Sequence, residues 1–302
     1  TGQETVVAVI DTGVDYTHSD LDSNIWINSK EIPGNNLDDD RNGFVDDIRG
    51  WDFVNDDSAP MDEEGHGTHV AGIIAAENNG FGTTGVAFNA KIMPVRVLGE
   101  AGGYQSDIAA GIRYAVDNGA DAINLSLGAN LTSAQAANAI KYAAEKGVVV
   151  VMAAGNESQS QPLYPARYAI NYGIAVGAVN RNNQMPGFSN KAGTTQLDYV
   201  VAPGVNVYST WMGNSYQFSS GTSMASPYVA GVAALILSAN PNLSAAQVET
   251  ILTSTANANA TSVQAASSVN STTGSRLRSS AAMVDSVTGT TIDADFDSFS
   301  VA

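Results

Sequence analysis

The 302-residue sequence has no cysteine, few basic residues and only three histidines. The lack of cysteine excludes disulfide bonds, thiolate metal sites and a cysteine nucleophile. With 13 Lys and Arg against 30 Asp and Glu, the formal net charge is −17, which argues against binding to nucleic-acid phosphates or an anionic membrane. No apolar run approaches about 18 residues, so we expect no membrane span. No leader-like segment begins at Thr1, so we expect any targeting segment to have been removed.

The acidic residues that are present are concentrated in the first part of the chain. Residues 31–64 hold 12 of the 30 carboxylates, and residues 1–64 hold 17. A scattered set of acidic residues serves solubility. A segment as dense as this one repels itself, and a bound cation would relieve that repulsion. The sequence therefore predicts a cation site within residues 31–64.

Apolar runs typical of buried strands alternate with segments of helical periodicity. The strand-like runs lie at residues 5–10, 92–98, 122–125, 148–153 and 174–179, and the helical segments at 70–76, 108–116, 134–144, 224–237 and 245–252. This alternation predicts an α/β fold, with a mostly parallel twisted sheet flanked by helices on both faces in three layers. We expect one domain over residues 1–288 and a polar C-terminal tail over 289–302.

Three short polar motifs lie where such a fold exposes side chains. They read Asp-Thr-Gly at 11–13, Gly-His-Gly-Thr-His at 65–69 and Ser-Gly-Thr-Ser-Met-Ala-Ser-Pro at 220–227. Taken singly, they are also compatible with a turn, a zinc site and a helix cap. The zinc interpretation fits poorly, because helical zinc sites use a four-residue histidine spacing with an acidic base between. Together the motifs supply a carboxylate, an imidazole and a hydroxyl, the groups of nucleophilic catalysis.

These motifs, in the order Asp, His, Ser, resemble the subtilase (subtilisin-like serine protease) family over roughly residues 5–285. The resemblance implies that Ser223 is the nucleophile and that His66 is the general base and then the general acid. It also implies that Asp11 orients the imidazole and stabilises its protonated form. The resemblance therefore implies that the domain expected over residues 1–288 is a subtilisin-like peptidase catalytic domain.

The resemblance also implies how the site binds its substrate. Asn156, in the Ala-Ala-Gly-Asn block at 153–156, is expected to form an oxyanion hole with the Ser223 backbone N–H. An extended peptide would pair between two backbone edges. Leu163 stands where the family often has a small residue, which predicts a shallow specificity pocket, and Glu157 at its mouth favours a basic side chain. The expected substrate-binding residues are Gly102, Gly103, Tyr104, Ser126, Leu127, Gly128, Ala154, Gly155 and Leu163.

One stretch of the acidic segment has the pattern of a calcium loop. Residues 38–47 read Asp-Asp-Asp-Arg-Asn-Gly-Phe-Val-Asp-Asp, with oxygen donors at alternate positions and glycine at the sixth. Arg49 replaces the usual bidentate Glu at the twelfth position, so Asp46 or Asp47 would have to complete the coordination shell of the Ca²⁺ ion. The alternative is an acidic, solvated loop. The candidate Ca²⁺ ligands are Asp38, Asp40, Asn42, Phe44, Asp46 and Asp47.

A second calcium site is implied by the family resemblance. Subtilases often hold calcium between an Asp shortly after the catalytic Asp and the loop that ends the histidine helix. The expected donors are the side chains of Asp20 and Asn79 and the carbonyls of Glu77, Phe81 and Thr83. In a chain without disulfides, bound calcium would stabilise the folded state by mass action.

The sequence thus predicts a calcium-stabilised serine endopeptidase that hydrolyses proteins or peptides through an acyl-enzyme. By resemblance and from its calcium dependence we expect it to be secreted, with an N-terminal propeptide during maturation. Two alternatives stay open. A subtilase-type peptide ligase or cyclase would share every catalytic residue but needs a cap that excludes water. A catalytically silent pseudoprotease would bind peptides without cleaving them.

Overall fold

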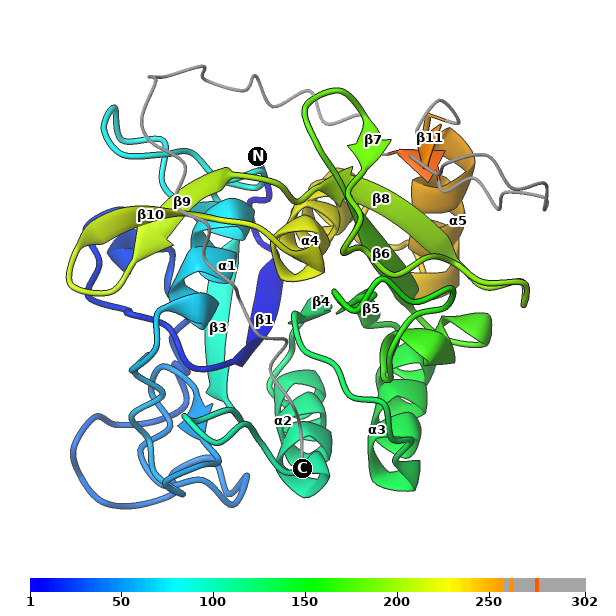
Figure 1. Ribbon diagram of the computed structural model, residues 1–302. Helices are drawn as coiled ribbons and strands as arrows, with labels where there is room; N and C mark the ends of the chain where they lie inside the picture. Colours follow the sequence, from blue (N-terminus) through cyan, green and yellow to red (C-terminus); the bar gives the residue numbers. More distant parts are fainter. Residues whose placement is uncertain (258–260, 263–274, 277–302) are drawn as a thin grey trace.

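The computed structural model describes residues 1–257, 261–262 and 275–276, and its centre is a parallel sheet of eight strands. The strand order is β12-β8-β6-β5-β4-β1-β3-β2 (Figure 1). The strands are β1 (Val6–Asp11), β2 (Trp51–Asp52), β3 (Lys91–Arg96), β4 (Ala122–Leu125), β5 (Val149–Ala153), β6 (Ile174–Val179), β8 (Tyr199–Pro203) and β12 (Ser275–Arg276). The predicted α/β fold with a mostly parallel sheet is therefore confirmed. The predicted domain end at 288 and the tail over 289–302 lie outside the described residues.

Helices cover both faces of the sheet, as the alternation of strand side chains requires. Ala8 and Ile10 of β1 pack in one core with α2 (Gln105–Asp117) and α3 (Ala134–Glu145). Val7 and Val9 point to the other face, where they pack with α1, α4 and α5. These three helices are α1 (His66–Ala75), α4 (Thr222–Ala239) and α5 (Ala245–Thr255). The site described below lies where the carboxyl ends of β1, β4 and β5 meet the first turns of α1 and α4.

The structure adds elements that the sequence pattern did not predict. β8 extends the sheet beyond β6, and β9 (Val207–Trp211) and β10 (Ser215–Ser219) form an antiparallel hairpin. A short strand, β7 (Gln184–Met185), pairs with β11 (Thr261–Ser262), and 3₁₀ helices occupy Asp22–Asn24 and Ala166–Ile170. The helix predicted at 70–76 begins earlier, at His66. The residues of β9 and β10 mix polar and aromatic side chains, so they gave no clear apolar run.

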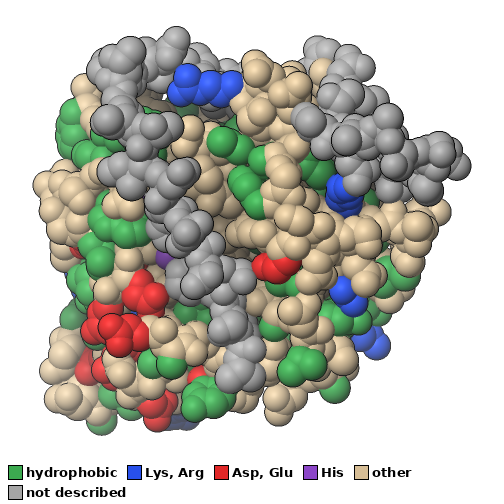
Figure 2. Space-filling model, viewed as in Figure 1, with side chains coloured by type: hydrophobic (Ala, Val, Ile, Leu, Met, Phe, Trp, Pro, Cys, Tyr) green, Lys and Arg blue, Asp and Glu red, His purple; other side chains and the backbone are tan. Residues whose placement is uncertain are grey.

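The acidic segment forms a set of loops at one side of the sheet, and Figure 2 shows its carboxylates gathered on that side. It is anchored by aromatic packing. The ring of Phe44 lies 5.0 Å from Trp51 and 4.8 Å from Tyr114 of α2 between centroids. The buried carboxylate of Asp47 accepts a hydrogen bond of 2.6 Å from the Tyr114 hydroxyl. Phe44, a predicted calcium ligand, therefore contributes its side chain to the core.

Helix α4 is the one helix among the described residues that is long and apolar enough to cross a membrane by length and composition. It packs against the sheet, and 61% of its apolar window is buried inside the protein. A core helix meets the same length and composition test, so α4 is accounted for by its place in the core.

Candidate active site

Asp11 and His66 form a buried hydrogen-bonded pair at the carboxyl end of β1. The Asp11 Oδ1 atom accepts hydrogen bonds from His66 Nδ1 at 2.7 Å and from the Thr12 backbone N–H at 2.8 Å. Asp11 is fully buried and His66 is 2% exposed. Gly67 permits this approach, because a Cβ atom there would lie 2.0 Å from the Gly13 carbonyl oxygen. With Nδ1 donating to Asp11, Nε2 is the basic atom of the neutral ring.

The surroundings of His66 favour its protonated form. Burial acts to lower the pKa of His66, but the charge of Asp11 and the hydrogen bond to it raise that pKa above its usual value. The charges of Asp62 and Glu64 add to this effect. A histidine arranged in this way can accept a proton and hold it as an imidazolium paired with Asp11.

The other two histidines have structural environments. His69 Nε2 donates to the carbonyl oxygens of Val207 and Gln217, each at 3.1 Å, and burial lowers the pKa of His69 to about 4. His69 is therefore neutral and ties α1 to the β9–β10 hairpin. His18 Nε2 donates to the Ser215 carbonyl oxygen at 2.9 Å, on the same hairpin. Of the three histidines, His66 is the one hydrogen-bonded to a carboxylate.

Ser223 lies in the first turn of α4 and is half-buried. Its hydroxyl donates to the Ser126 carbonyl oxygen at 3.2 Å, and the Ser126 hydroxyl donates to the Ser223 carbonyl oxygen at 2.8 Å. Asn124 extends this network from β4, since it donates to Ser126 Oγ and accepts from the Ser226 hydroxyl. The network fixes the predicted nucleophile against the end of β4, beside the predicted substrate-binding segment.

Asn156 follows β5 and faces the start of α4. Its Oδ1 atom accepts from the Thr222 backbone N–H at 2.9 Å and from the Thr222 hydroxyl at 3.1 Å. The position that a Cβ atom would take at Gly221 lies 3.2 Å from Asn156 Nδ2 and 3.7 Å from Ser223 N. Asn156 Nδ2 and the Ser223 backbone N–H therefore both lie next to Gly221, and two such donors are what an oxyanion hole requires.

The predicted specificity pocket is occupied at its base by Leu163. This side chain is 2% exposed, and its Cδ1 atom lies 3.1 Å from where a Cβ of Gly128 would stand. Its Cγ atom lies 2.8 Å from the corresponding position at Gly155. Next to Ala154 and Gly155, Glu157 accepts a hydrogen bond of 2.7 Å from Asn190 through Oε2, and its Oε1 atom is buried with no hydrogen-bond partner among the described residues. This geometry fits a shallow pocket with a carboxylate at its edge.

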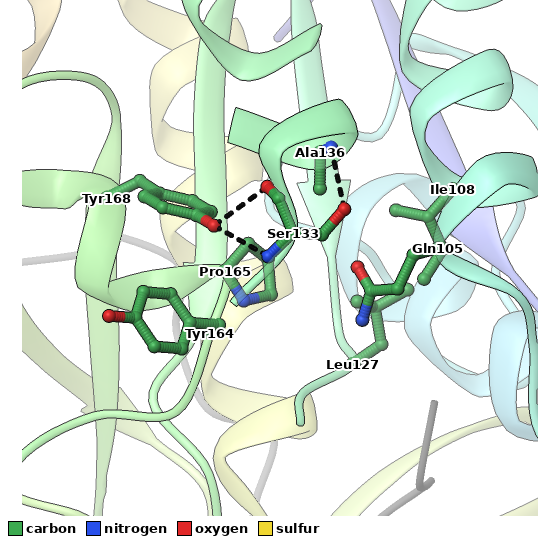
Figure 3. A pocket seen from close by; sticks show the side chains of 8 residues that line it. All are labelled: Gln105, Ile108, Leu127, Ser133, Ala136, Tyr164, Pro165 and Tyr168. Carbon is green, nitrogen blue, oxygen red and sulfur yellow. Dashed lines mark hydrogen bonds between the residues drawn. The ribbon is translucent and has the colours of Figure 1, made fainter. Parts of the chain in front are cut away.

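The residues predicted to form the opposite substrate-binding edge are Gly102, Gly103 and the 68% exposed Tyr104, which lie just before α2. Beyond Leu127 the structure has a small cavity between α2, the start of α3 and residues 164–168 (Figure 3). Its lining comprises Gln105, Ile108, Leu127, Ser133, Ala136, Tyr164, Pro165 and Tyr168. Sequence reasoning found Leu127 alone of this set, because the rest come from separate segments that share no motif.

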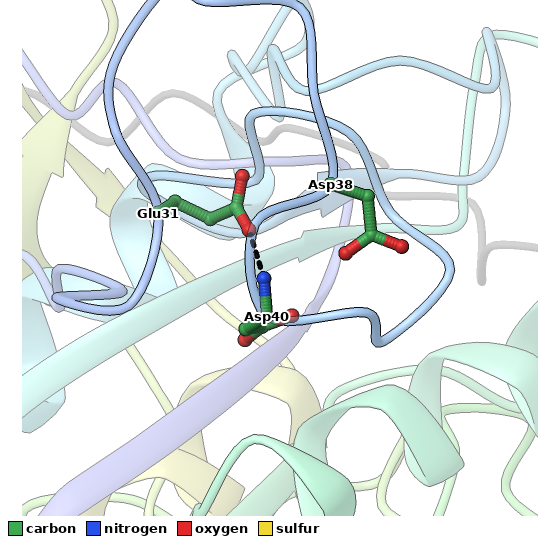
Figure 4. A group of neighbouring side chains, drawn as sticks. All are labelled: Glu31, Asp38 and Asp40. Atoms are coloured by element: carbon green, nitrogen blue, oxygen red, sulfur yellow. Dashed lines mark hydrogen bonds between the residues drawn. The ribbon is translucent and has the colours of Figure 1, made fainter.

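The first predicted calcium loop brings three carboxylates together. Oxygen atoms of Glu31, Asp38 and Asp40 all lie within 4.8 Å of one another (Figure 4). Glu31 is buried, and its Oε1 atom accepts from the Asp39 and Asp40 backbone N–H groups at 2.8 and 3.0 Å. Hard oxygen donors at this spacing suit Ca²⁺. Glu31 was not predicted as a ligand, because it lies outside the 38–47 pattern and reaches the loop only in the fold.

The remaining predicted donors of this loop have other hydrogen-bond partners in the structure. Asp46 accepts from the backbone N–H groups of residues 34 and 36, each at 2.8 Å. Asn42 Oδ1 accepts from the Phe44 N–H at 2.8 Å, while Asn42 Nδ2 donates to Asp47 at 3.1 Å. These contacts hold the loop around the Glu31, Asp38 and Asp40 cluster.

The residues predicted for the second calcium site gather around the buried Asp20 carboxylate. Its Oδ1 atom accepts from Asn79 Nδ2 at 3.0 Å, and its Oδ2 atom accepts from the Thr83 N–H at 3.0 Å and the Tyr216 hydroxyl at 3.2 Å. Burial raises the pKa of Asp20 above its usual value. The Glu77 N–H donates to the Asp20 carbonyl oxygen, and the Phe81 N–H to Asn79 Oδ1. The structure thus brings Asp20 against the loop of residues 77–83. Tyr216 of β10, which the sequence did not predict, contacts the same carboxylate.

Comparison with known proteins gives a consistent result. A sequence model of the subtilase family matches residues 2–277. A thermophilic serine proteinase of Bacillus sp. (strain AK1) is 49% identical over 243 residues, which cover 80% of this chain and 53% of that protein. Thermitase of Thermoactinomyces vulgaris is 41% identical over 239 residues, covering 78% of this chain and 76% of thermitase. The chain spans about half the length of the first relative and 59% of an alkaline protease of Alkalihalobacillus alcalophilus.

Solved structures agree with the sequence comparison. A cold-adapted subtilisin-like serine proteinase superposes with a TM-score of 0.73 at 33% identity, covering 92% of this chain and 89% of that one. A protease from Pseudoalteromonas arctica superposes with a TM-score of 0.71 at 38% identity, covering 87% and 86% of the two chains.

Proposed function

This chain belongs to the subtilase family, and on that premise we propose that it is a calcium-stabilised serine endopeptidase acting on proteins or peptides. The observation that carries the proposal is the buried 2.7 Å hydrogen bond between Asp11 and His66. It is supported by Asn156, which contacts Thr222 at the start of α4, and by Ser223, whose hydroxyl donates to Ser126 after the neighbouring strand β4.

In this proposal each group has a defined role. Ser223 Oγ attacks the peptide carbonyl while His66 Nε2 accepts the hydroxyl proton, and Asp11 stabilises the imidazolium. The negative oxygen that develops is stabilised by Asn156 Nδ2 and the Ser223 backbone N–H. His66 then donates its proton to the leaving amine, and water hydrolyses the acyl-enzyme with His66 again as base. The raised pKa of His66 fits this role, because the transition state carries the protonated ring.

We further propose that Glu31, Asp38 and Asp40 hold one Ca²⁺, and that the loop around Asp20 and Asn79 holds another. Bound calcium supplies positive charge that offsets carboxylate repulsion, and it stabilises the folded state by mass action. The density of carboxylates in residues 31–64 and the absence of cysteine support this proposal. Structural calcium sites fill where calcium is abundant, which supports a protein that acts outside the cell. Membership of the subtilase family supports maturation from a precursor with an N-terminal propeptide.

The proposal is tested with a fluorophosphonate probe and a long peptide whose products are weighed. The protein should be labelled at Ser223 and should yield hydrolysed fragments. Ser223→Ala should lose both labelling and turnover, by about 10⁴-fold or more in kcat, with an unchanged melting temperature. Ligated or cyclic products would instead indicate a ligase. A protein that takes no label, or a Ser223→Ala variant with full activity, would contradict the triad.

A further inference from the structure

The carboxylate of Asp62, four residues before His66, accepts five hydrogen bonds while only 5% exposed. Its Oδ1 atom accepts from the Thr12 hydroxyl at 2.9 Å and from the Glu64 and Gly65 N–H groups at 3.0 and 2.9 Å. Its Oδ2 atom accepts from the Thr68 N–H at 2.8 Å and the Thr68 hydroxyl at 2.6 Å. None of the roles assigned above accounts for a buried carboxylate with this many partners.

These partners belong to the two segments that carry Asp11 and His66. Thr12 follows Asp11 directly, donates its N–H to Asp11 Oδ1, and accepts the Gly67 N–H at 2.9 Å through its hydroxyl. Asp62 Oδ1 therefore contacts the turn after β1, and both oxygens of Asp62 contact N–H groups at the start of α1. The chain is also tight there, since a Cβ atom at Gly13 would lie 2.7 Å from the Met61 carbonyl oxygen.

Asp62 also supplies the N-terminal cap that α1 otherwise lacks. The residue at the N-cap position is Gly65, which has no side chain to accept the unpaired N–H groups of the first turn. Asp62 accepts hydrogen bonds from two of these N–H groups, those of Gly65 and Thr68. Its negative charge also lies at the positive end of the helix dipole, which stabilises the helix. His66 is the first residue of this helix, so the cap fixes the backbone that carries the imidazole.

We propose that Asp62 is a positioning residue: it locks the Thr12 turn to the first turn of α1 and so holds Asp11 and His66 at their 2.7 Å contact. This inference rests on the proposed peptidase function. Asp62 touches neither the substrate-binding residues nor Ser223 among the contacts described. Its effect on the reaction passes through the geometry and the charge of the Asp11–His66 pair.

Because Asp62 is charged, the proposal also predicts a change in the pH dependence of kcat/KM, which a purely structural role would not produce. The groups that act on the charge of His66 include Asp11 from β1, Asp62 and Glu64 from the loop before α1, and His69 one helical turn further on. Asp11, Asp62 and Glu64 raise the pKa of His66. Removing the charge of Asp62 therefore lowers that pKa. Because the base must be neutral, the acid limb of kcat/KM against pH moves to lower pH.

The test compares Asp62→Asn with Asp56→Asn, which removes one charge from an exposed position in the same loop. Active sites are counted by fluorophosphonate labelling, and kcat, KM and the pH profile are measured on a chromogenic peptide. Asp62→Asn should lower kcat per labelled site by about 10²-fold, the cost of a misplacement near 1 Å, with little change in KM. Its acid limb should move to lower pH, whereas Asp56→Asn should match the unsubstituted protein.

The inference is overturned if Asp62→Asn merely melts earlier or labels less, with kcat per labelled site and the acid limb unchanged. Should that variant not fold, Thr68→Val decides, since it keeps the side-chain shape and removes the hydroxyl that donates to Asp62 Oδ2 and accepts the Asp15 N–H. An unchanged kcat per labelled site in Thr68→Val would then overturn the inference. The peptidase proposal fails separately, if Ser223→Ala is as active as the unsubstituted protein.

Discussion

The amide of Asn156 contacts the fold through its oxygen and borders the proposed reaction site through its nitrogen. The oxygen accepts from Thr222, which fixes the rotamer, and the nitrogen consequently faces the space beside Gly221 and the Ser223 N–H. A donor fixed in this way needs no reorganisation when negative charge develops on the substrate. The same residue type in an ordinary turn would make only the first of these contacts.

Two substitutions separate these two tasks. Asn156→Ala removes donor and acceptor, so kcat should fall by about 10²–10³-fold and stability by about 1 kcal/mol through the lost bonds to Thr222. Asn156→Asp keeps an acceptor for Thr222 and removes the donor, so it should lose kcat with a smaller change in melting temperature. Steady-state kinetics and thermal melts check both. A kcat unaffected in either variant would refute the oxyanion role.

At the scale of elements, the β9–β10 hairpin lies directly on α1. The Ser209 hydroxyl donates to the His69 carbonyl oxygen and the Thr210 hydroxyl to the Thr68 carbonyl oxygen, each at 2.7 Å. Gly72 makes this approach possible, because a Cβ atom there would lie 2.1 Å from Thr210 Oγ1. The hairpin thereby covers the helix whose first residue is His66.

Substitution of Gly72 tests this contact between elements. Gly72→Ala places a methyl group against two hydroxyls, and overpacking of this kind costs about 1–3 kcal/mol even though alanine favours helices. Thermal melts should show a lower Tm, and the backbone N–H of His69 in α1 should exchange its hydrogen faster with solvent. Gly187→Ala is the matched control, since its Cβ would meet nothing within 4 Å. Equal melting temperatures for the two variants would contradict the contact.

At the scale of the whole molecule, the net charge of −17 is unevenly spread along the chain. Repulsion between the acidic side chains therefore acts mainly in the first part of the chain. Glu31 is buried beside Asp38 and Asp40, and no Lys or Arg pairs with these three among the ion pairs of the described residues. Like charges at this distance destabilise the folded chain unless a cation binds. The acidic loops should therefore respond to calcium more strongly than the rest of the molecule.

Removal of calcium should accordingly destabilise the protein. A ligand at about 100 times its Kd adds roughly 2.7 kcal/mol, and each kcal/mol shifts the Tm of a domain of 150–250 residues by about 2–4 °C. A chelator should lower the Tm by about 5–10 °C, and added calcium should restore it. Glu31→Gln should weaken calcium binding measured by calorimetry, whereas Glu100→Gln, at an exposed position away from the cluster, should not. A Tm indifferent to chelator would exclude structural calcium.

The sequence by itself determined the α/β architecture, because buried parallel strands must be continuous apolar runs and their helices must show apolar periodicity. It also singled out Asp11, His66 and Ser223 as candidate catalytic residues, since these side chains follow strands or begin helices in motifs of small residues. Apolar periodicity alone does not set where a helix begins: α1 starts at His66 because Asp62, a residue outside the apolar pattern, caps it.

Only the tertiary structure decided which separate segments meet. Nothing in the sequence joins Glu31 to the 38–47 loop, Tyr216 to Asp20, or Asp62 to Thr12, because a hydrogen bond between residues far apart in the chain follows no local period. The hairpin of β9 and β10 was likewise hidden, since its strands lie over a helix rather than in the sheet. Local patterning specifies elements, whereas the long-range polar contacts that position the site form only when those elements pack.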